Sequence, residues 1–476
     1  MVNVLCEPHK VRCRLPLTFG SSALSSPPPS PPPPTADPSK EKLRRLQCHF
    51  TWDFEIKDKV DVRHTLGTLA LRLEHGPSRN QATYLALKAY LCHLEGSSRE
   101  ALAILREAKE ALQRDHPGTF SRQVLVTYGN YAWIYYQLTD YNRVELYLGQ
   151  IREICRDLSS PDPYSAPIPE IYAQKGWSLL AMGFRNGELA KRCFQKALEL
   201  QESSEELQEG LAFSTFASWT HSWDEKVKKE GQRLLEGLIR SQPENYEAKI
   251  YLANILKEDH GRAVSLADEV VQNSLNPELL RAATKVYRPC SLFRAISTLK
   301  TIALHHDHHL LHYDLGIYYM ELLDQASREE RAQIVEDAIE SFRRSLVANP
   351  QSIYARLKLA KLYGERTPRY EEEVYLGVME QLPTASRRCQ QAFYLQWGEF
   401  LLHKKGQRLE ALRAYQACCD IPGDHPMEQK RLEQRLRELA GVFQREGETE
   451  HEGAVCSLLR ALAEKHLGGR VGEAPS

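Results

Sequence analysis

The chain has 476 residues, of which 42% are hydrophobic and 26% charged, and its formal net charge is −1. This composition is typical of a globular protein, long enough for about three ordinary domains or one repeat array. The balanced charge excludes a uniformly basic nucleic-acid-binding protein, so any anion site must be local. No apolar run reaches the ~18 residues of a membrane span, and Pro8, Lys10 and Arg12 interrupt the hydrophobic stretch that a signal peptide requires.

The eleven cysteines are scattered along the chain and form no Cys-x-x-Cys pair. An odd number of cysteines without regular spacing favours a reducing compartment over a disulfide framework. We expect most of them to be buried as small hydrophobic residues.

The first 39 residues differ from the rest of the chain. Residues 25–39 contain eight prolines in fifteen positions. Proline removes a backbone donor and fixes φ, so neither helix nor sheet forms there. We predict a disordered proline-rich tail over residues 1–39, and a polyproline ligand for a small adaptor domain is the alternative interpretation. Order is expected to begin near Lys40.

The aromatic-rich residues 126–148 show helical spacing. Tyr128, Ala132 and Tyr135 fall at i, i+4 and i+7, which places them on one helix face, and the segment 139–140 supplies a turn before a second helix. A small residue at the contact lets two antiparallel helices approach to roughly 8–10 Å. This layout is typical of a tetratricopeptide repeat.

Further helix pairs of this kind follow one another along the chain. They are predicted over residues 89–108, 126–148, 177–197, 252–263, 283–302, 315–342, 359–363, 397–418 and 439–461. The two halves of the pair at 315–342 lie about ten residues further apart than in a minimal repeat, so we expect an extended first helix there. No stretch alternates with period two, and sheet is therefore not expected.

The sequence thus predicts an all-α fold, a superhelical solenoid of antiparallel tetratricopeptide helix pairs around a central cavity. We expect an N-terminal subdomain over residues 40–240, a middle one over 241–375 and a C-terminal one over 376–465, with a frayed tail over 466–476. The concave face, lined by the first helix of each pair, is the default place for a ligand.

Five histidines crowd residues 305–312, and imidazoles at i, i+3 and i+4 are able to bind zinc. The segment falls between two repeats and has no accompanying cysteine, so a polar turn is favoured over a metal site. No zinc-protease motif, nucleophile elbow or Walker loop is present, and paired carboxylates lie in charged runs. We predict no catalytic residue, no cofactor, no metal and no enzymatic activity.

The basic residues of the segment RAATKVYR form a stripe. Arg281, Lys285 and Arg288 fall at i, i+4 and i+7 on one face of a first helix. Such a stripe on an inner helix is able to follow a phosphate backbone. A solvated face with ion pairs to neighbouring repeats explains it equally well.

Several stretches together resemble one family. CHFTW (48–52), TYGNYAWIYYQL (127–138), KGWSLL (175–180) and LLHYDLGIYY (310–319) are similar to the interferon-induced proteins with tetratricopeptide repeats. The similarity runs from about Lys40 to about residue 465, and generic repeats do not carry CHFTW followed by YGNYAWIYY. The proline-rich leader is not part of the family pattern.

The resemblance implies a cytoplasmic, non-enzymatic antiviral effector. Family members hold the 5′ end of single-stranded RNA in a basic tunnel, discriminate ends that bear a triphosphate or a cap without ribose methylation, and block translation. Some members work chiefly as partners in homo- or hetero-oligomers. By the same resemblance, Thr65 corresponds to a position that touches the 5′ phosphates, Trp177 to a tryptophan that stacks on a cap base, and Arg281, Lys285 and Arg288 to basic tunnel positions.

Other family positions have changed. A family lysine is Ala181 here, a tyrosine is Gly187, an arginine that grips the phosphates is Ala217, a glutamine is Leu69, and a His-Gln pair is Tyr313–Asp314. A hydrogen bond to a charged group is worth about 1.5–3 kcal/mol. The loss of two cations from one phosphate pocket therefore weakens binding by roughly 3–6 kcal/mol.

Two functions follow as hypotheses. The first is capture of a non-self RNA 5′ end in a basic cavity, with inhibition of viral translation or replication. The alternative is a tetratricopeptide scaffold that assembles with related chains or signalling proteins and binds RNA ends weakly.

Overall fold

The structure is a computed structural model that describes residues 38–52, 54, 62–75, 80–364, 368–422 and 426–471. The predicted proline-rich tail lies outside these residues up to position 37. The first described helix is α1 (Pro38–Arg44), close to the predicted beginning of order at Lys40.

The helices follow one another along the whole described chain. The first half contains α1, α3 (Val62–His75), α4 (Gln81–Leu94), α5 (Ser98–Asp115), α6 (Phe120–Gln123), α7 (Leu125–Gln137), α8 (Tyr141–Asp157), α9 (Pro169–Ala181), α10 (Gly187–Leu200), α11 (Glu205–Ser222) and α12 (Glu225–Ser241). The second half contains α13 (Tyr246–Ile255), α14 (His260–Asn273), α15 (Pro277–Tyr287), α16 (Leu292–His305), α17 (His309–Leu322), α18 (Arg328–Ala348), α19 (Ile353–Gly364), α20 (Pro368–Met379), α21 (Arg387–His403), α22 (Arg408–Asp420), α23 (Pro426–Glu446) and α24 (Thr449–Val471). Short 3-10 helices cover Phe184–Asn186 and Leu382–Thr384. The described residues contain no strand, and the predicted all-α class is confirmed.

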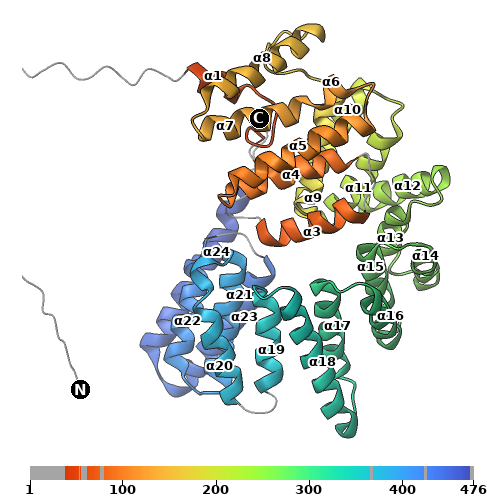
Figure 1. The fold of residues 1–476 in the computed structure, drawn as a ribbon. Helices are drawn as coiled ribbons and strands as arrows, with labels where there is room; N and C mark the ends of the chain where they lie inside the picture. Colours follow the sequence, from red (N-terminus) through yellow and green to blue (C-terminus); the bar gives the residue numbers. More distant parts are fainter. Residues whose placement is uncertain are drawn as a thin grey trace, which may run out of the picture.

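Consecutive helices pack in pairs, and the pairs curl into a superhelix (Figure 1). The upper body contains the helices up to α12, and the lower body contains those from α17 onward, with α13 to α16 joining the two. Helix α3 lies between the bodies. A methyl group added to Gly67 of α3 would lie 3.9 Å from the ring of His309 at the beginning of α17, so α3 contacts a helix of the lower body.

Glycine on the first helix of a pair receives an aromatic ring from the second. The contacts join Gly176 with Phe194, Gly316 with Phe342, and Gly398 with Tyr415. Each ring is fully buried, and a Cβ built on each glycine would lie within 2.7 Å of a ring atom. The small residue that the repeat pattern requires therefore makes room for one specific ring.

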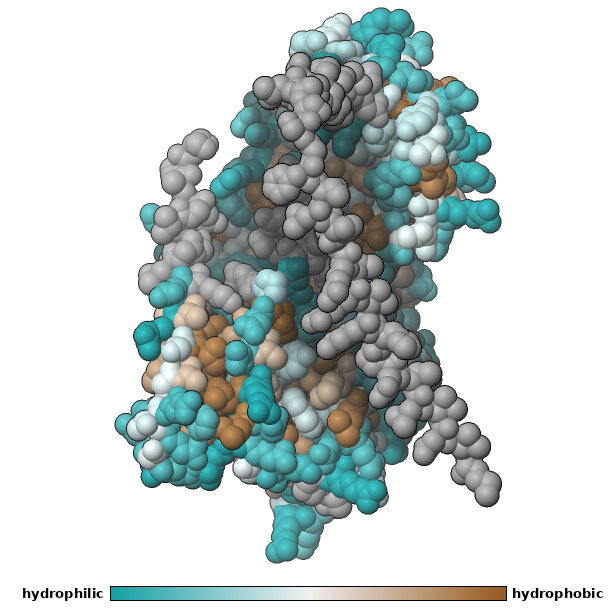
Figure 2. All heavy atoms as spheres, turned by 90° about the vertical axis from the view of Figure 1, so that its left-hand side faces the viewer, coloured by the Kyte–Doolittle hydropathy of each residue, from teal (hydrophilic) through white to brown (hydrophobic). Residues whose placement is uncertain are grey.

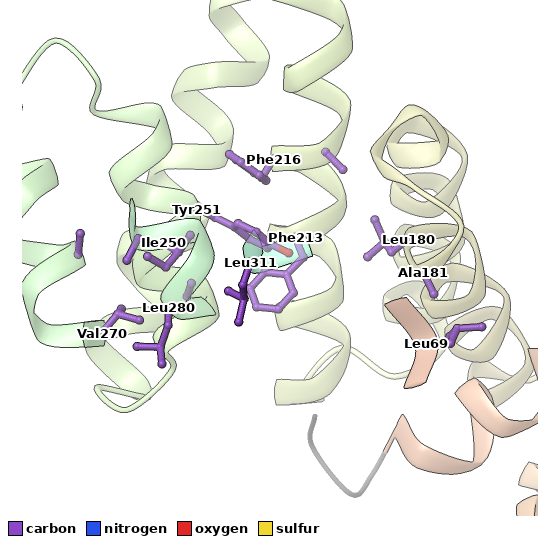
Figure 3. Close-up of a cluster of buried hydrophobic side chains, with 14 of the residues drawn as sticks. Leu69, Leu180, Ala181, Phe213, Phe216, Ile250, Tyr251, Val270, Leu280 and Leu311 are labelled. Atoms are coloured by element: carbon purple, nitrogen blue, oxygen red, sulfur yellow. The ribbon is translucent and has the colours of Figure 1, made fainter. Parts of the chain in front are cut away.

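One hydrophobic cluster joins α3, α4 and the helices from α9 to α19 (Figure 3). In the close-up, Leu69 of α3 faces Leu180 and Ala181 of α9, while Phe213, Tyr251 and the residues from α14, α15 and α17 extend the cluster across the solenoid. Separate clusters occupy residues 43–171 and 353–462. The predicted subdomain boundaries after residues 240 and 375 stay predictions.

The CHFTW segment is held by a buried polar clasp. The His49 backbone N–H donates to Asn130 Oδ1 at 3.2 Å, the Asn130 amide lies 2.9 Å from His49 Nδ1, and His49 Nε2 lies 3.0 Å from Ser178 Oγ. A Cβ on Gly129 would lie 2.7 Å from Cys48 Cβ. The two most family-specific stretches of the sequence therefore bind each other and α9.

Two helix expectations need correction. We predicted no helix pair between residues 197 and 252, yet α11 and α12 form one. Because α11 is buried nearly all round, with eleven buried residues that include Glu209 and Ser214, it shows no amphipathic stripe. The extended helix of the pair at 315–342 is the second one, since α18 has 21 residues and α17 only 14.

The C-terminal helix is longer than expected. Helix α24 continues to Val471, six residues into the segment 466–476 that we expected to fray, and residues 472–476 lie outside the described part. Most described cysteines are buried, as predicted, while Cys290 is exposed. Among the described helices, none combines the length and the hydropathy that crossing a lipid bilayer requires.

Figure 2 shows the molecule from the side where its two bodies approach each other. Apolar side chains gather in the recess between the bodies and on the lower body, and hydrophilic side chains surround them. The polar residues on the first helices of the pairs, which are α13, α15, α17, α19, α21 and α23, decide what this recess is able to bind.

Candidate nucleic-acid interface

The predicted basic stripe lies on α15 and is paired with acids of α17. Arg281 donates from Nε to Asp314 Oδ2 at 2.6 Å and from Nη2 to Oδ1 at 3.3 Å. Lys285 Nζ lies 3.8 Å from the same carboxylate, and Arg288 forms a two-bond ion pair with Glu321. The three predicted cations thus share one face of the helix, and two carboxylates of the protein already occupy it.

Burial changes the charge states around this stripe. The pKa of Glu278, which lies one turn before Arg281, is raised by burial. The pKa of Lys285 is lowered by burial and then by Arg281, while Asp314 opposes this change. The main cause of both shifts is burial, which disfavours the charged form of each group. An anion that enters must therefore replace Asp314 or Glu321.

A second polar network joins the upper body to α15, and we did not predict it from the sequence. Arg72 of α3 donates to the hydroxyl of Tyr84 at 3.5 Å and interacts electrostatically with Glu247 and Glu278. The hydroxyl of Tyr251 donates to Glu247. The sequence feature that could have indicated this network is Arg72 between Leu71 and Leu73. A charged side chain on the apolar face of a helix requires buried partners.

Thr65 lies on α3 and is 5% exposed. Its backbone carbonyl accepts a hydrogen bond from the Thr68 hydroxyl at 3.0 Å. Because α3 reaches His309 through Gly67, Thr65 belongs to the helix that separates the two bodies. The predicted contact of Thr65 with the 5′ phosphates stays a prediction.

Trp177 lies on α9 and is only 3% exposed. Its ring packs edge-to-face against Phe194 at 5.1 Å and Phe213 at 6.2 Å between centroids. The indole N–H is buried and has no hydrogen-bond partner in the described structure. The indole is thus packed as a core side chain, and stacking on a base requires these neighbours to move.

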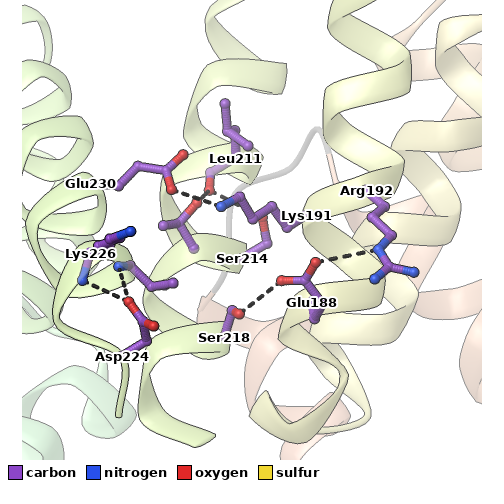
Figure 4. Close-up of polar contacts among 11 residues, drawn as sticks. Glu188, Lys191, Arg192, Leu211, Ser214, Ser218, Asp224, Lys226 and Glu230 are labelled. Carbon is purple, nitrogen blue, oxygen red and sulfur yellow. Dashed lines mark hydrogen bonds and ion pairs between the residues drawn. The ribbon is translucent and has the colours of Figure 1, made fainter. Parts of the chain in front are cut away.

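The changed positions on α10 and α11 form a closed contact. A Cβ on Gly187 would lie 2.3 Å from the Ser218 backbone nitrogen and 2.8 Å from Ala217 Cβ, and Ala217 is fully buried. Glu188 accepts a hydrogen bond from Ser218 at 3.0 Å and pairs with Arg192 (Figure 4). The space that a tyrosine and an arginine would need is filled by the close approach of the two helices.

Ala181 lies at the end of α9 and is 8% exposed. It faces Leu69 in the core cluster of Figure 3, so both changed positions contribute apolar surface. The five predicted site residues therefore form two groups. Thr65 and Trp177 lie on the touching helices α3 and α9, and the three cations lie on α15. The electrostatic interactions of Arg72 with Glu247 and Glu278 connect α3 of the first group with α15 of the second.

The histidine-rich segment forms a turn before α17. The ring of His308 accepts a hydrogen bond from the Leu310 backbone N–H at 3.3 Å, and His312 Nε2 lies 2.8 Å from Asp307. No group of three or more His, Cys, Asp or Glu side chains in the described residues is arranged to hold a metal ion.

The inner wall of the lower body carries a third group of charges. Glu399 of α21 bridges Lys361 of α19 at 3.2 Å and Arg435 of α23 at 2.9 Å, and Arg435 also pairs with Glu438 at 2.7 Å. Three successive inner helices are tied together in this way. The fold and this wall define a tetratricopeptide solenoid with a charged concave face.

Comparison with known proteins gives a more specific identity. No family model matches the sequence. Mouse interferon-induced protein with tetratricopeptide repeats 3 is 30% identical over 333 residues, which cover 68% of this chain and 78% of that protein. The human antiviral innate immune response effector IFIT1 is 29% identical over 395 residues, 79% of this chain and 82% of IFIT1. The chain belongs to the family of interferon-induced proteins with tetratricopeptide repeats.

Solved structures of IFIT1 share the fold. A monomeric mutant of IFIT1 with Gppp-AAAA superposes with a TM-score of 0.64 at 26% identity, covering 90% of this chain and 99% of that one. The human IFIT1 dimer with PPP-AAAA superposes with a TM-score of 0.61 at 26% identity, covering 91% and 100%. The similarity therefore extends over the complete solenoid of IFIT1.

Proposed function

We propose that this chain is a cytoplasmic antiviral effector that captures the 5′ end of single-stranded RNA on its concave face without catalysing a reaction. The observation that carries the proposal is the fold match over 90% of the chain to IFIT1 with Gppp-AAAA, together with the match to IFIT1 with PPP-AAAA. Triphosphate and incompletely methylated capped ends are the substrate class. Held RNA is withheld from translation.

The chemistry of capture is an exchange of anions. Arg281 offers a guanidinium fork that fits two phosphate oxygens, and Lys285 offers a point charge beside it. Asp314 and Glu321 hold these cations in place until phosphate arrives. Since a carboxylate contact is given up for each phosphate contact, the net gain is smaller than for an unpaired arginine. Thr65 and Trp177 are the proposed contacts of the 5′ end itself.

A protein-interaction scaffold is the second candidate. The closed contact between Gly187 and Ala217 favours it, because it removes the place of two phosphate-binding side chains. In this role the chain assembles with itself or with related family members, and RNA binding becomes secondary.

A binding assay separates the two candidates. Four-nucleotide RNAs bearing triphosphate, a Gppp cap or a 5′ hydroxyl are titrated at two salt concentrations, about 50 and 200 mM, because phosphate contacts weaken with salt. We expect the first two RNAs to bind more tightly than the hydroxyl RNA, by at least about tenfold. Equal and weak binding of all three RNAs contradicts 5′-end capture. Light scattering on the same sample gives the mass, and a strict monomer with tight RNA binding contradicts the scaffold.

A further inference from the structure

Two inner helices of the lower body, α19 and α23, each carry a pair of cations. Lys358 and Lys361 are three residues apart on α19, and Arg431 and Arg435 are four residues apart on α23, so each pair lies on one helix face. Helix α21 lies between these helices and contacts both. Glu399 of α21 forms ion pairs with one cation of each pair, Lys361 on α19 and Arg435 on α23.

The other two cations have no such partner. Neither Lys358 nor Arg431 forms a hydrogen bond or an ion pair in the described structure, and Lys358 is half-buried. The pKa of Lys358 is lowered by burial and then by Lys361 and Arg431, while Glu399 and Glu321 oppose the shift only in part. A half-buried cation close to two others costs folding free energy. An anion that binds there removes that cost.

Lys358 and Arg431 differ from the arginines of α15 in their ion pairs. On α15, each arginine of the stripe already has a carboxylate partner from α17. Glu321, which holds Arg288, is also close enough to Lys358 to attract it, so the two groups of charges are neighbours along the wall. A nucleotide strand that leaves α15 therefore meets Lys358 next, where no carboxylate has to be displaced.

We propose that Lys358 and Arg431, flanked by Lys361 and Arg435, form a subsite for a backbone phosphate of single-stranded RNA. The proposal rests on the RNA-binding function proposed above and adds two cations that form no ion pair in the described structure. The Arg431 guanidinium donates to two phosphate oxygens, and the Lys358 ammonium lies beside them as a point charge. The subsite reads no base and recognises any nucleotide sequence.

The test uses the full-length chain and a 5′-triphosphate RNA of about 12 nucleotides, within the usual range of single-strand site sizes. Lys358→Gln and Arg431→Gln are each expected to weaken binding about threefold to tenfold, and each lowers the slope of log affinity against log salt by about 0.7. Lys358→Arg keeps the charge and retains most of the affinity. The thermal midpoint of Lys358→Gln stays equal to that of the parent or rises, because a repelled cation has been removed.

Matched controls remove one charge elsewhere. The first control is Lys257→Gln, because Lys257 lies in the exposed turn between α13 and α14. The second control is Arg437→Gln, because Arg437 lies on α23 about 120° around the helix axis from Arg431. Neither is expected to change affinity or salt slope. If the parent chain binds triphosphate RNA and the double variant K358Q/R431Q binds with the same affinity and slope, the subsite is wrong and the proposed function stands. If the parent binds no RNA, both are wrong.

Discussion

The upper body and the inner wall of the lower body are stabilised in different ways. In the upper body, the buried polar residues His49, Asn130 and Ser178 bind one another as neutral groups among aromatic rings. On the inner wall, the polar contacts are ion pairs such as Arg281 with Asp314 and Lys361 with Glu399, and most remain partly exposed.

The neutral hydrogen bonds stabilise the fold, whereas the ion pairs of the inner wall affect ligand binding. Neutral hydrogen bonds in a desolvated core fix one geometry, because a missing partner costs about 1–3 kcal/mol. Partly exposed ion pairs are worth less, and they exchange partners with a mobile anion. The residues that identify the family most clearly, CHFTW and YGNYAW, therefore build the frame, whereas the charged wall sets the affinity for a ligand.

The largest expected effect comes from breaking the frame. Phe194 fills the space between Gly176 and Gly210 and contacts Trp177, so Phe194→Ala leaves a cavity that neither glycine is able to fill. We expect the free energy of unfolding of the upper body to fall by about 3–5 kcal/mol. Urea denaturation followed by circular dichroism measures it.

Phe293→Ala is the matched control, because that phenylalanine is 77% exposed. Its substitution is expected to change the free energy of unfolding by less than about 0.5 kcal/mol. Equal losses for the two variants would show that the ring-in-glycine contact does not stabilise the frame.

The next effect comes from protonating the clasp. Burial lowers the pKa of His49 from its ordinary value of 6.5 to about 3. Below pH 6.5, His49 becomes protonated in the unfolded chain but stays neutral in the folded chain. The free energy of unfolding therefore decreases as the pH falls from 6.5 towards 3. Between pH 6.5 and pH 5 the loss is about 2 kcal/mol. Urea unfolding at several pH values measures it.

His49→Gln isolates this contribution from the other histidines. The variant is less stable than the parent at pH 7, and the difference narrows as the pH falls, because only the parent has His49 to protonate. Parallel pH profiles for the two proteins would exclude His49 as the origin of the acid sensitivity.

The frame was largely predictable, since its repeats have a local pattern. A recurring pattern of small and bulky residues predicted the pairs over 177–197 and 315–342, and it named Gly316, Phe342 and Phe194 among their residues. The contact of Phe194 with Gly176 is visible only in the structure. The pattern failed at α11, whose neighbours cover it on every side. It also could not show which helix of the sixth predicted pair is long, because the spacing between the two halves does not depend on which one carries the extra residues.

The sequence predicts the basic stripe of the charged wall but not the partners of its residues. The stripe of Arg281, Lys285 and Arg288 is visible at i, i+4 and i+7, but its carboxylates lie about a repeat away on α17. Lys358 and Arg431 are separated by 73 residues (431 − 358) and share no local motif. Such partners come together only through the curvature of the solenoid, which a sequence pattern does not specify.

The smallest of the expected effects tests the wall itself. Asp314→Asn keeps the shape of the side chain and removes the carboxylate that holds Arg281 and Lys285. Arg281 loses a charged partner, so the variant is expected to be less stable, yet its affinity for 5′-triphosphate RNA is expected to rise about tenfold, or ~1.4 kcal/mol. Titration of labelled RNA and thermal unfolding measure the two quantities on one sample.

Asp268→Asn provides the comparison for this variant. The Asp268 carboxylate forms an ion pair with Arg294 and accepts a hydrogen bond from the Tyr287 hydroxyl. The ion pair joins α14 and α16, which are the second helices of their pairs. Stability should fall there too, while RNA affinity stays constant, because those helices do not line the inner wall. An unchanged or lower RNA affinity in Asp314→Asn would mean that phosphate does not compete for Arg281. In that case the positive charge that serves RNA would have to come from the lower body, where Lys358 and Arg431 have no carboxylate to give up.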